Sequence, residues 1–189
     1  MKDVLAVIWQ RLRILFALIG LLCVIHIINV ATNYRLNQFG VIPGHQISLS
    51  RIVIAPFIHG SLTHLVNNLI LLAVFSFLCL LRPVKFYLAA SALIIVGSGL
   101  AVWQFARPGV HIGASGWIFG LWAMSIALAF FERRVITVCV SVLVIFVYGG
   151  MIRGVLPQSP YISYEYHLFG AIAGVIAAAV IPSIKWLRA

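Results

Sequence analysis

Charged side chains are scarce in this sequence, and acidic ones are almost absent. Only 8% of the 189 residues are charged, and three acidic residues stand against 13 lysines and arginines. A soluble domain is about 25% charged. With 63% hydrophobic residues, the chain has too few polar groups to cover a water-exposed surface, and it is far too apolar for intrinsic disorder. The composition therefore predicts an integral membrane protein in contact with the lipid bilayer.

Three further absences exclude classes of site. The three cysteines are Cys23, Cys79 and Cys139. They lie singly inside apolar runs, which predicts neither a disulfide framework nor a cysteine metal site. The zinc-protease motif H-E-x-x-H is also missing. The basic residues occur singly or in pairs without the interleaved aromatic residues of a nucleic-acid-binding stripe. We therefore expect no metal, no cofactor and no nucleic-acid partner.

Six apolar runs are approximately long enough to cross a bilayer, which takes about 20 residues per helix. They cover residues 14–30, 62–81, 86–103, 115–131, 135–152 and 164–181. Ser61 is a suitable N-cap for the second run. The first run resembles a signal peptide, but no A-x-A cleavage pattern follows it, so we favour a retained helix. The sequence predicts an all-α integral membrane fold, a single domain of six transmembrane helices over residues 1–189.

The positive charges favour one orientation in the membrane. If the N-terminus is cytoplasmic, nine lysines and arginines fall on the cytoplasmic side and four on the other. Cytoplasmic loops of membrane proteins carry an excess of these residues. The pattern predicts that both termini lie inside the cell. The short core, with no room for a further domain, favours the inner membrane of a bacterium.

Polar residues on three of these runs are expected at a similar depth. At about 1.5 Å per helical residue, Ser115, His167 and Asn68 all fall several ångströms below the outer surface, with His64 one turn above Asn68. Polar residues inside a membrane span are candidates for function, although a helix–helix hydrogen bond is the common alternative. Ser115 also stands where a loop turns into a helix, and free backbone N–H groups at such a start can stabilise an oxyanion.

Small residues line the helix face that carries His167. Gly170 and Gly174 share that face, and Gly116 gives the fourth run a small residue of its own at the matching level. Because small residues let membrane helices approach closely, His167 is expected to come within hydrogen-bonding distance of Ser115. Such a pair would join a nucleophile to its base.

The acidic residues limit the possible catalytic chemistry. Asp3 and Glu132 lie on the far side of the predicted bundle, and Glu165 is about 200° around its helix from His167. An aspartyl protease needs two intramembrane aspartates, whereas the sequence has one aspartate at its terminus. A dyad of Ser115 and His167, without a third carboxylate, is therefore the nucleophilic arrangement that the sequence offers.

Three motifs occur in a fixed order along the chain. They are His59-x4-His64-x3-Asn68, Gly113-Ala114-Ser115-Gly116 and His167-x2-Gly170-x3-Gly174. Their order and spacing resemble the rhomboid family of intramembrane serine proteases, over the whole six-helix core. The resemblance implies that Ser115 is the nucleophile and His167 the general base. It also implies an oxyanion hole made by the side chains of His64 and Asn68 and the backbone N–H of Ser115, with that of Ala114 as a further donor.

The same resemblance implies an activity and shows three departures. A rhomboid typically cuts single-span membrane proteins near the membrane boundary, after a small residue, so we expect substrates of this kind. The departures are Ser50 in place of Trp before Arg51, Tyr166 in place of a small residue before the histidine, and Phe119 in place of a frequent Tyr. None of them removes a member of the dyad.

Three other functions stay open. A non-catalytic rhomboid-like protein that binds membrane helices would be favoured by the loss of Ser115 or His167, and both are present. A small transporter or channel would predict paired intramembrane charges or inverted repeats, and neither is evident. A rhomboid subtype that trims C-terminal sorting tails fits the same motifs.

Overall fold

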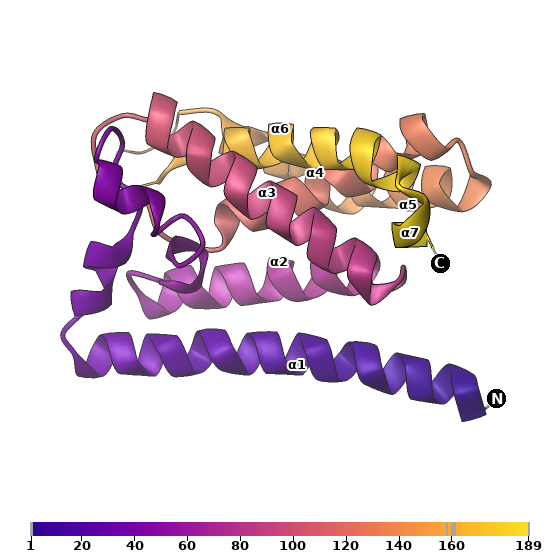
Figure 1. Ribbon diagram of the computed structural model, residues 1–189, viewed down its shortest axis with the longest axis horizontal. Coiled ribbons are helices and arrows are strands. Elements are labelled where there is room, and N and C mark those ends of the chain that lie inside the picture. Colours follow the sequence, from indigo (N-terminus) through magenta and orange to yellow (C-terminus); the bar gives the residue numbers. More distant parts are fainter. Residues whose placement is uncertain (1, 158, 160–161, 189) are drawn as a thin grey trace.

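The structure is a computed structural model that describes residues 2–157, 159 and 162–188. Its main helices are α1 (Lys2–Ala31), α2 (Leu62–Leu80), α3 (Val84–Phe105), α4 (Ser115–Glu132), α5 (Val135–Tyr148), α6 (Tyr164–Val180) and α7 (Lys185–Arg188). Short 3-10 helices are η1 (Arg35–Phe39), η2 (Gln46–Leu49), η3 (Ala55–Phe57), η4 (Gly149–Val155) and η5 (Ile181–Ser183). Within the described part of the chain, six helices are long and apolar enough to cross a membrane (Figure 1). The protein is therefore a multi-pass integral membrane protein with an all-helical fold.

The start of α2 follows from its cap. The Ser61 side chain accepts a hydrogen bond from the N–H of His64 at 3.1 Å, which satisfies one of the free donors at a helix start. Ser61 is thus the N-cap that the sequence predicts. Because the cap holds the first turn, it also holds His64 at a defined place beside the loops at this end of the bundle.

Two helices differ from the predicted apolar runs. α1 begins at Lys2 instead of residue 14, since arginines near a helix end can extend their charged groups to the membrane surface and need not stop the helix. α5 ends at Tyr148, and the next residues tighten into η4. The pair Gly149 and Gly150 explains this end, because glycine weakens a helix interior.

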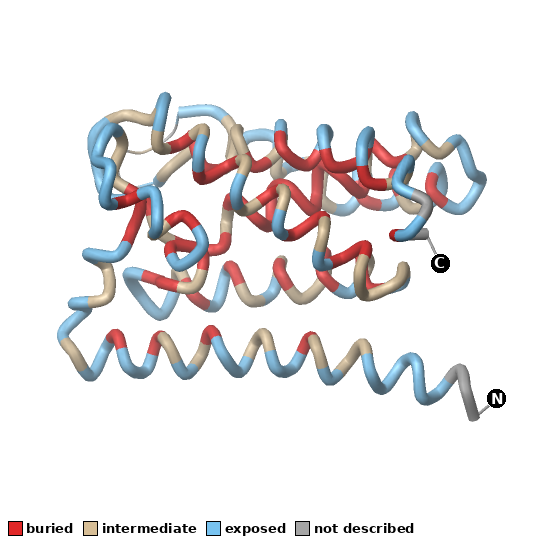
Figure 2. Tube along the Cα trace, in the orientation of Figure 1, coloured by how far each residue is buried: buried red, intermediate tan, exposed pale blue. Residues whose placement is uncertain are grey.

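α4 is the central helix of the bundle. Of its 18 residues 67% are buried, against 22% and 17% in 18-residue stretches of the α1 span and of the span that begins with α5. In Figure 2, buried positions follow α4 and the facing sides of its neighbours. α4, which begins at Ser115, is therefore held by protein contacts along most of its length.

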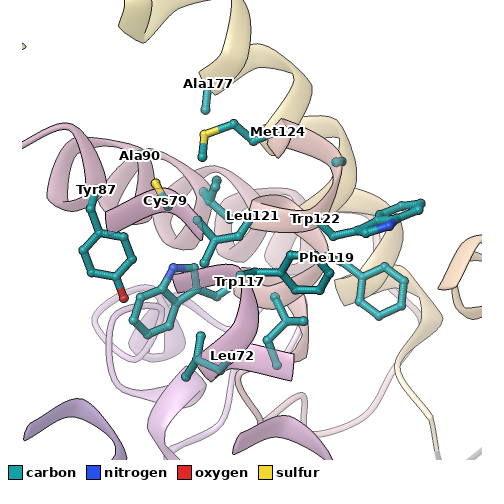
Figure 3. Packing of buried hydrophobic residues seen from close by; sticks show 14 of the residues in the cluster. Leu72, Cys79, Tyr87, Ala90, Trp117, Phe119, Leu121, Trp122, Met124 and Ala177 are labelled. Carbon is teal, nitrogen blue, oxygen red and sulfur yellow. The ribbon is translucent and has the colours of Figure 1, made fainter. Parts of the chain in front are cut away.

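The core around α4 combines apolar packing with hydrogen bonds between helices. Leu72 of α2 and Leu121 of α4 are both fully buried there (Figure 3). The indole N–H of Trp117 donates to the Ser91 hydroxyl of α3 at 3.0 Å. Hydrogen bonds of this kind, together with close packing, hold membrane helices to one another in the absence of water.

α4 and α6 meet backbone to backbone. A Cβ atom added to Gly170 would collide with the backbone of Gly116, and one added to Gly174 would collide with the backbone of Gly120. No side chain larger than hydrogen fits at these points. The glycine spacing seen in the sequence therefore fixes how α6 lies against α4, and with it the place of His167.

Candidate active site

Ser115 begins α4 at a tight turn. Gly113 has φ +109°, a conformation that glycine adopts without a steric penalty. This turn brings the chain directly into α4, with Ala114 as the N-cap and Ser115 as the first helical residue. The Ser115 side chain is half-buried, and its backbone N–H belongs to the first turn, where no helical carbonyl is available to accept it.

His167 is held by the segment between α5 and α6. Its Nδ1 lies 2.9 Å from the carbonyl oxygen of Gly154 in η4. A carbonyl oxygen only accepts hydrogen bonds, so Nδ1 carries the proton and Nε2 of the neutral ring is left as the basic nitrogen. The ring also stacks on Phe119 of α4, with centroids 4.1 Å apart and planes 3° apart. The imidazole therefore has a fixed tautomer and a fixed plane.

The structure brings Ser115 and His167 to the same crossing of α4 and α6. Phe119, one turn after Ser115, stacks on His167, and Gly170, almost one turn after His167, touches Gly116. Among the described residues, the hydrogen bonds do not include one between Ser115 and His167. Catalytic hydrogen bonds are often long before substrate binds, so this geometry is compatible with a dyad that tightens later.

His64 and Asn68 lie on one face of α2 near this turn. A Cβ atom on Gly113 would lie 2.6 Å from Nε2 of His64, so the His64 ring packs directly against the turn that leads to Ser115. The side-chain amide of Asn68 donates to the His64 carbonyl at 2.7 Å, which leaves its second N–H for another partner. Both residues thus have a donor to offer beside the turn.

The backbone N–H of Ala114 has a partner that sequence analysis missed. It donates to Nε2 of His59 at 3.4 Å, so this predicted oxyanion donor is directed at a buried ring. Burial, and after it the neighbouring His64, lowers the pKa of His59 to about 3. His59 is therefore a neutral acceptor at pH 7. In the sequence, the signal for this contact is the position of His59 five residues before His64 in the first motif.

The departures noted in the sequence have structural consequences. Tyr166 is buried and fills the space that Gly116 leaves open, so the two residues are matched across the helix crossing. The Arg51 guanidinium donates to the Gln38 carbonyl at 2.7 Å and lies 5.8 Å from the centroid of the Phe39 ring. This arginine therefore ties the first loop together although no tryptophan precedes it.

Comparison with known proteins assigns the chain to a family. Residues 46–183 match the Rhomboid domain. The chain belongs to the rhomboid family. Uncharacterized proteins of Mycobacterium bovis and Mycobacterium tuberculosis are each 34% identical to it over 169 residues, which is 85% of this chain and 70% of the relative. An uncharacterized protein of Mycobacterium leprae is 33% identical over 168 residues, 84% of this chain and 66% of the relative.

The rhomboid match confirms the resemblance that the motifs gave. It includes all the candidate site residues, from His59 to His167, whereas α1 and η1 lie entirely outside it. α1 nevertheless contacts the site of this rhomboid chain, because the side-chain amide of Asn29 donates to the His59 carbonyl at 3.2 Å. The first helix is thus joined by hydrogen bonds, through His59, to the residue before Ser115.

Proposed function

We propose that this rhomboid protein is an intramembrane serine endopeptidase with Ser115 as the nucleophile and His167 as the general base. The observation that supports the proposal is the hydrogen bond from Nδ1 of His167 to the Gly154 carbonyl. It leaves Nε2 as the basic nitrogen on a ring that lies at the helix crossing beside Ser115. A base that is oriented by a third group is the usual arrangement for activating a serine hydroxyl.

The proposed reaction needs no group other than these residues and water. The Ser115 oxygen attacks the carbonyl carbon of the scissile peptide bond while its proton moves to Nε2 of His167. The negative oxygen that forms accepts hydrogen bonds from the N–H of Ser115 and from His64 and Asn68. His167 then gives the proton to the leaving amine, and water, activated by the same ring, hydrolyses the acyl-enzyme. The Ala114 N–H can be a further donor if it releases its hydrogen bond to His59 and donates to the oxyanion instead.

The position of the site suggests the substrate class. α4, whose first residue is Ser115, begins at the end of the bundle opposite to the start of α1 and to α7 (Figure 1), and the charge pattern predicts that this end faces away from the cytoplasm. The 18 residues of α4 span about 26 Å of a hydrocarbon core of about 30 Å, which sets Ser115 below the outer surface. We infer that the substrates are single-span membrane proteins cut near their outer boundary.

Replacement of Ser115 tests the proposal most directly. We expect Ser115→Ala to lose labelling by a fluorophosphonate probe and to slow cleavage of a synthetic single-span substrate, with a small residue at its outer boundary, by at least about 1,000-fold. Ser125→Ala is the matched control, because Ser125 lies on the same helix and its hydroxyl donates to the Leu121 carbonyl. Wild-type turnover by purified Ser115→Ala would end the proposal.

A second candidate is a rhomboid-like protein that binds membrane helices without cutting them. The observation that favours it is that Ser115 and His167 are not hydrogen-bonded to each other in this structure. The same experiment separates the two, because a binding protein would retain the substrate, whereas a peptidase would release two fragments and would lose only turnover in Ser115→Ala.

A further inference from the structure

A cavity of about 630 Å³ lies at the end of the bundle away from Ser115. It is bounded by the end of α2, the start of α3, the end of α4 and the start of α5, and by the chain after α6. Much of its wall is apolar and buried, as at Met124 and Leu128, whereas its arginines Arg82 and Arg134 are half-buried and exposed. The cavity therefore joins an apolar interior to a basic rim.

The rim carries a net positive charge. Two guanidinium nitrogens of Arg82 donate to the two carboxylate oxygens of Glu132 at 2.6 and 2.7 Å, and this bidentate pair is locally neutral. Arg134 forms no ion pair with any other described residue, and the exposed Arg133 stands beside it. The Arg82–Glu132 pair thus holds the rim together, while Arg134 is available to an anion.

We propose that this cavity binds one anionic glycerophospholipid, with its phosphate at Arg134 and an acyl chain along Met124 and Leu128. An amphiphile matches the combination of a basic rim and an apolar wall, which neither a free anion nor a neutral hydrocarbon does. Basic pockets between transmembrane helices are known as sites for anionic lipid head groups. The surrounding bilayer supplies such lipids at this end of the helices. The lipid site shares no residue with the proposed catalytic site.

Charge and chain dependence of lipid binding test this proposal. Protein in a neutral detergent is titrated with phosphatidylglycerol, phosphatidylcholine or inorganic phosphate, and bound lipid is counted by native mass spectrometry. We expect one phosphatidylglycerol to bind at least fivefold more tightly than phosphatidylcholine. Arg134→Gln should weaken the binding of phosphatidylglycerol by about fivefold and leave the binding of phosphatidylcholine unchanged. Fivefold is the typical effect of one basic residue near the membrane surface.

Two further variants keep the test decisive. Arg35→Gln, an exposed arginine at the opposite end in η1, should bind lipid as the wild type does. Ala179→Phe fills part of the cavity from an exposed wall position. It should weaken the binding of phosphatidylglycerol although it leaves the charge of the rim unchanged. Equal affinity for the two lipids, an unchanged affinity in both Arg134→Gln and Ala179→Phe, or inorganic phosphate binding as tightly as the lipid would each overturn the proposal.

Discussion

α4 and α5 follow one another in the sequence and pack side by side, yet they have opposite environments. The span of α4 has the lower mean hydropathy, 1.4 against 2.6, and the larger buried share, 67% against 17%. In a soluble protein the more apolar helix would be the more buried. Here the less apolar helix occupies the centre, which shows that hydropathy reports contact with lipid and not burial in the protein.

The physical reason is that lipid is as apolar as leucine. Nothing drives one apolar helix against another, so close packing and hydrogen bonds select the central helix. α4 offers small and polar residues such as Gly116, Gly120 and Ser125, all buried. α5 offers residues such as Phe146, which is 88% exposed. The candidate nucleophile is thus carried by the helix that protein contacts fix best.

The largest expected effect comes from breaking the glycine contact of α4. Gly170→Leu puts a side chain against the Gly116 backbone, and we expect it to destabilise the fold by more than about 4 kcal/mol. Gly20→Leu in α1 is the matched control, because a Cβ there meets nothing within 4 Å. The yield of monodisperse protein and its unfolding midpoint measure both. A Gly170→Leu protein as stable as the wild type would show that the helices do not meet in this way.

A smaller loss of stability is expected when one leucine is shortened on each helix, and the two losses can be compared. Leu121 of α4 is fully buried, whereas Leu143 of α5 is 58% exposed. We expect Leu121→Ala to cost about 3 kcal/mol, since it leaves a cavity, and Leu143→Ala less than about 0.5 kcal/mol. Equilibrium unfolding in mixed micelles gives the two free energies. Equal losses would contradict the contrast between the central and the lipid-facing helix.

The third prediction is a pH effect at the start of α4. The pKa of His59 is lowered from 6.5 to about 3 in the folded protein, so the unfolded chain takes up this proton first. The contribution of His59 to the free energy of unfolding is therefore fully present above about pH 6.5. It is lost as the pH drops towards 3, by up to about 1.4 kcal/mol per pH unit. Between pH 7 and 5 the loss is about 2 kcal/mol.

His59→Gln isolates this contribution from the other histidines. It removes the titrating ring next to Ala114, so its unfolding free energy should depend less on pH than that of the wild type. α5 contains no histidine or carboxylate, and a variant of its exposed face such as Phe146→Leu should keep the wild-type pH dependence. The same slope in His59→Gln and wild type would remove His59 as the source.

Helix positions were largely predictable from the sequence, because each span needs a long apolar run and few residues interrupt it. α2 begins after Ser61 and α4 begins at Ser115, as the sequence indicates. Less predictable was the end of α5. The run to residue 152 contains no charged residue, so hydropathy alone gave no sign that the chain tightens into η4 at Gly149.

For the candidate site, the sequence indicated which helices meet, but it did not indicate the individual contacts. The glycine spacing around Gly116 and Gly170 was enough to place Ser115 and His167 at one crossing. The carbonyl that orients His167 belongs to Gly154, and a backbone acceptor leaves no mark in the residue types. The direction of the Ala114 N–H was equally hidden, because it depends on the conformation of Gly113.

The direct contact of α4 with α6 has a mechanical consequence. Bilayers differ in thickness, and membrane helices respond mainly by tilting. At Gly116–Gly170 and Gly120–Gly174 no side chains separate the two backbones. The two helices therefore cannot shift relative to each other and tilt as one rigid unit. A thinner or thicker membrane would then shift the depth of the Ser115 hydroxyl and the His167 imidazole together and leave their separation unaltered, while the outer helices absorb the deformation.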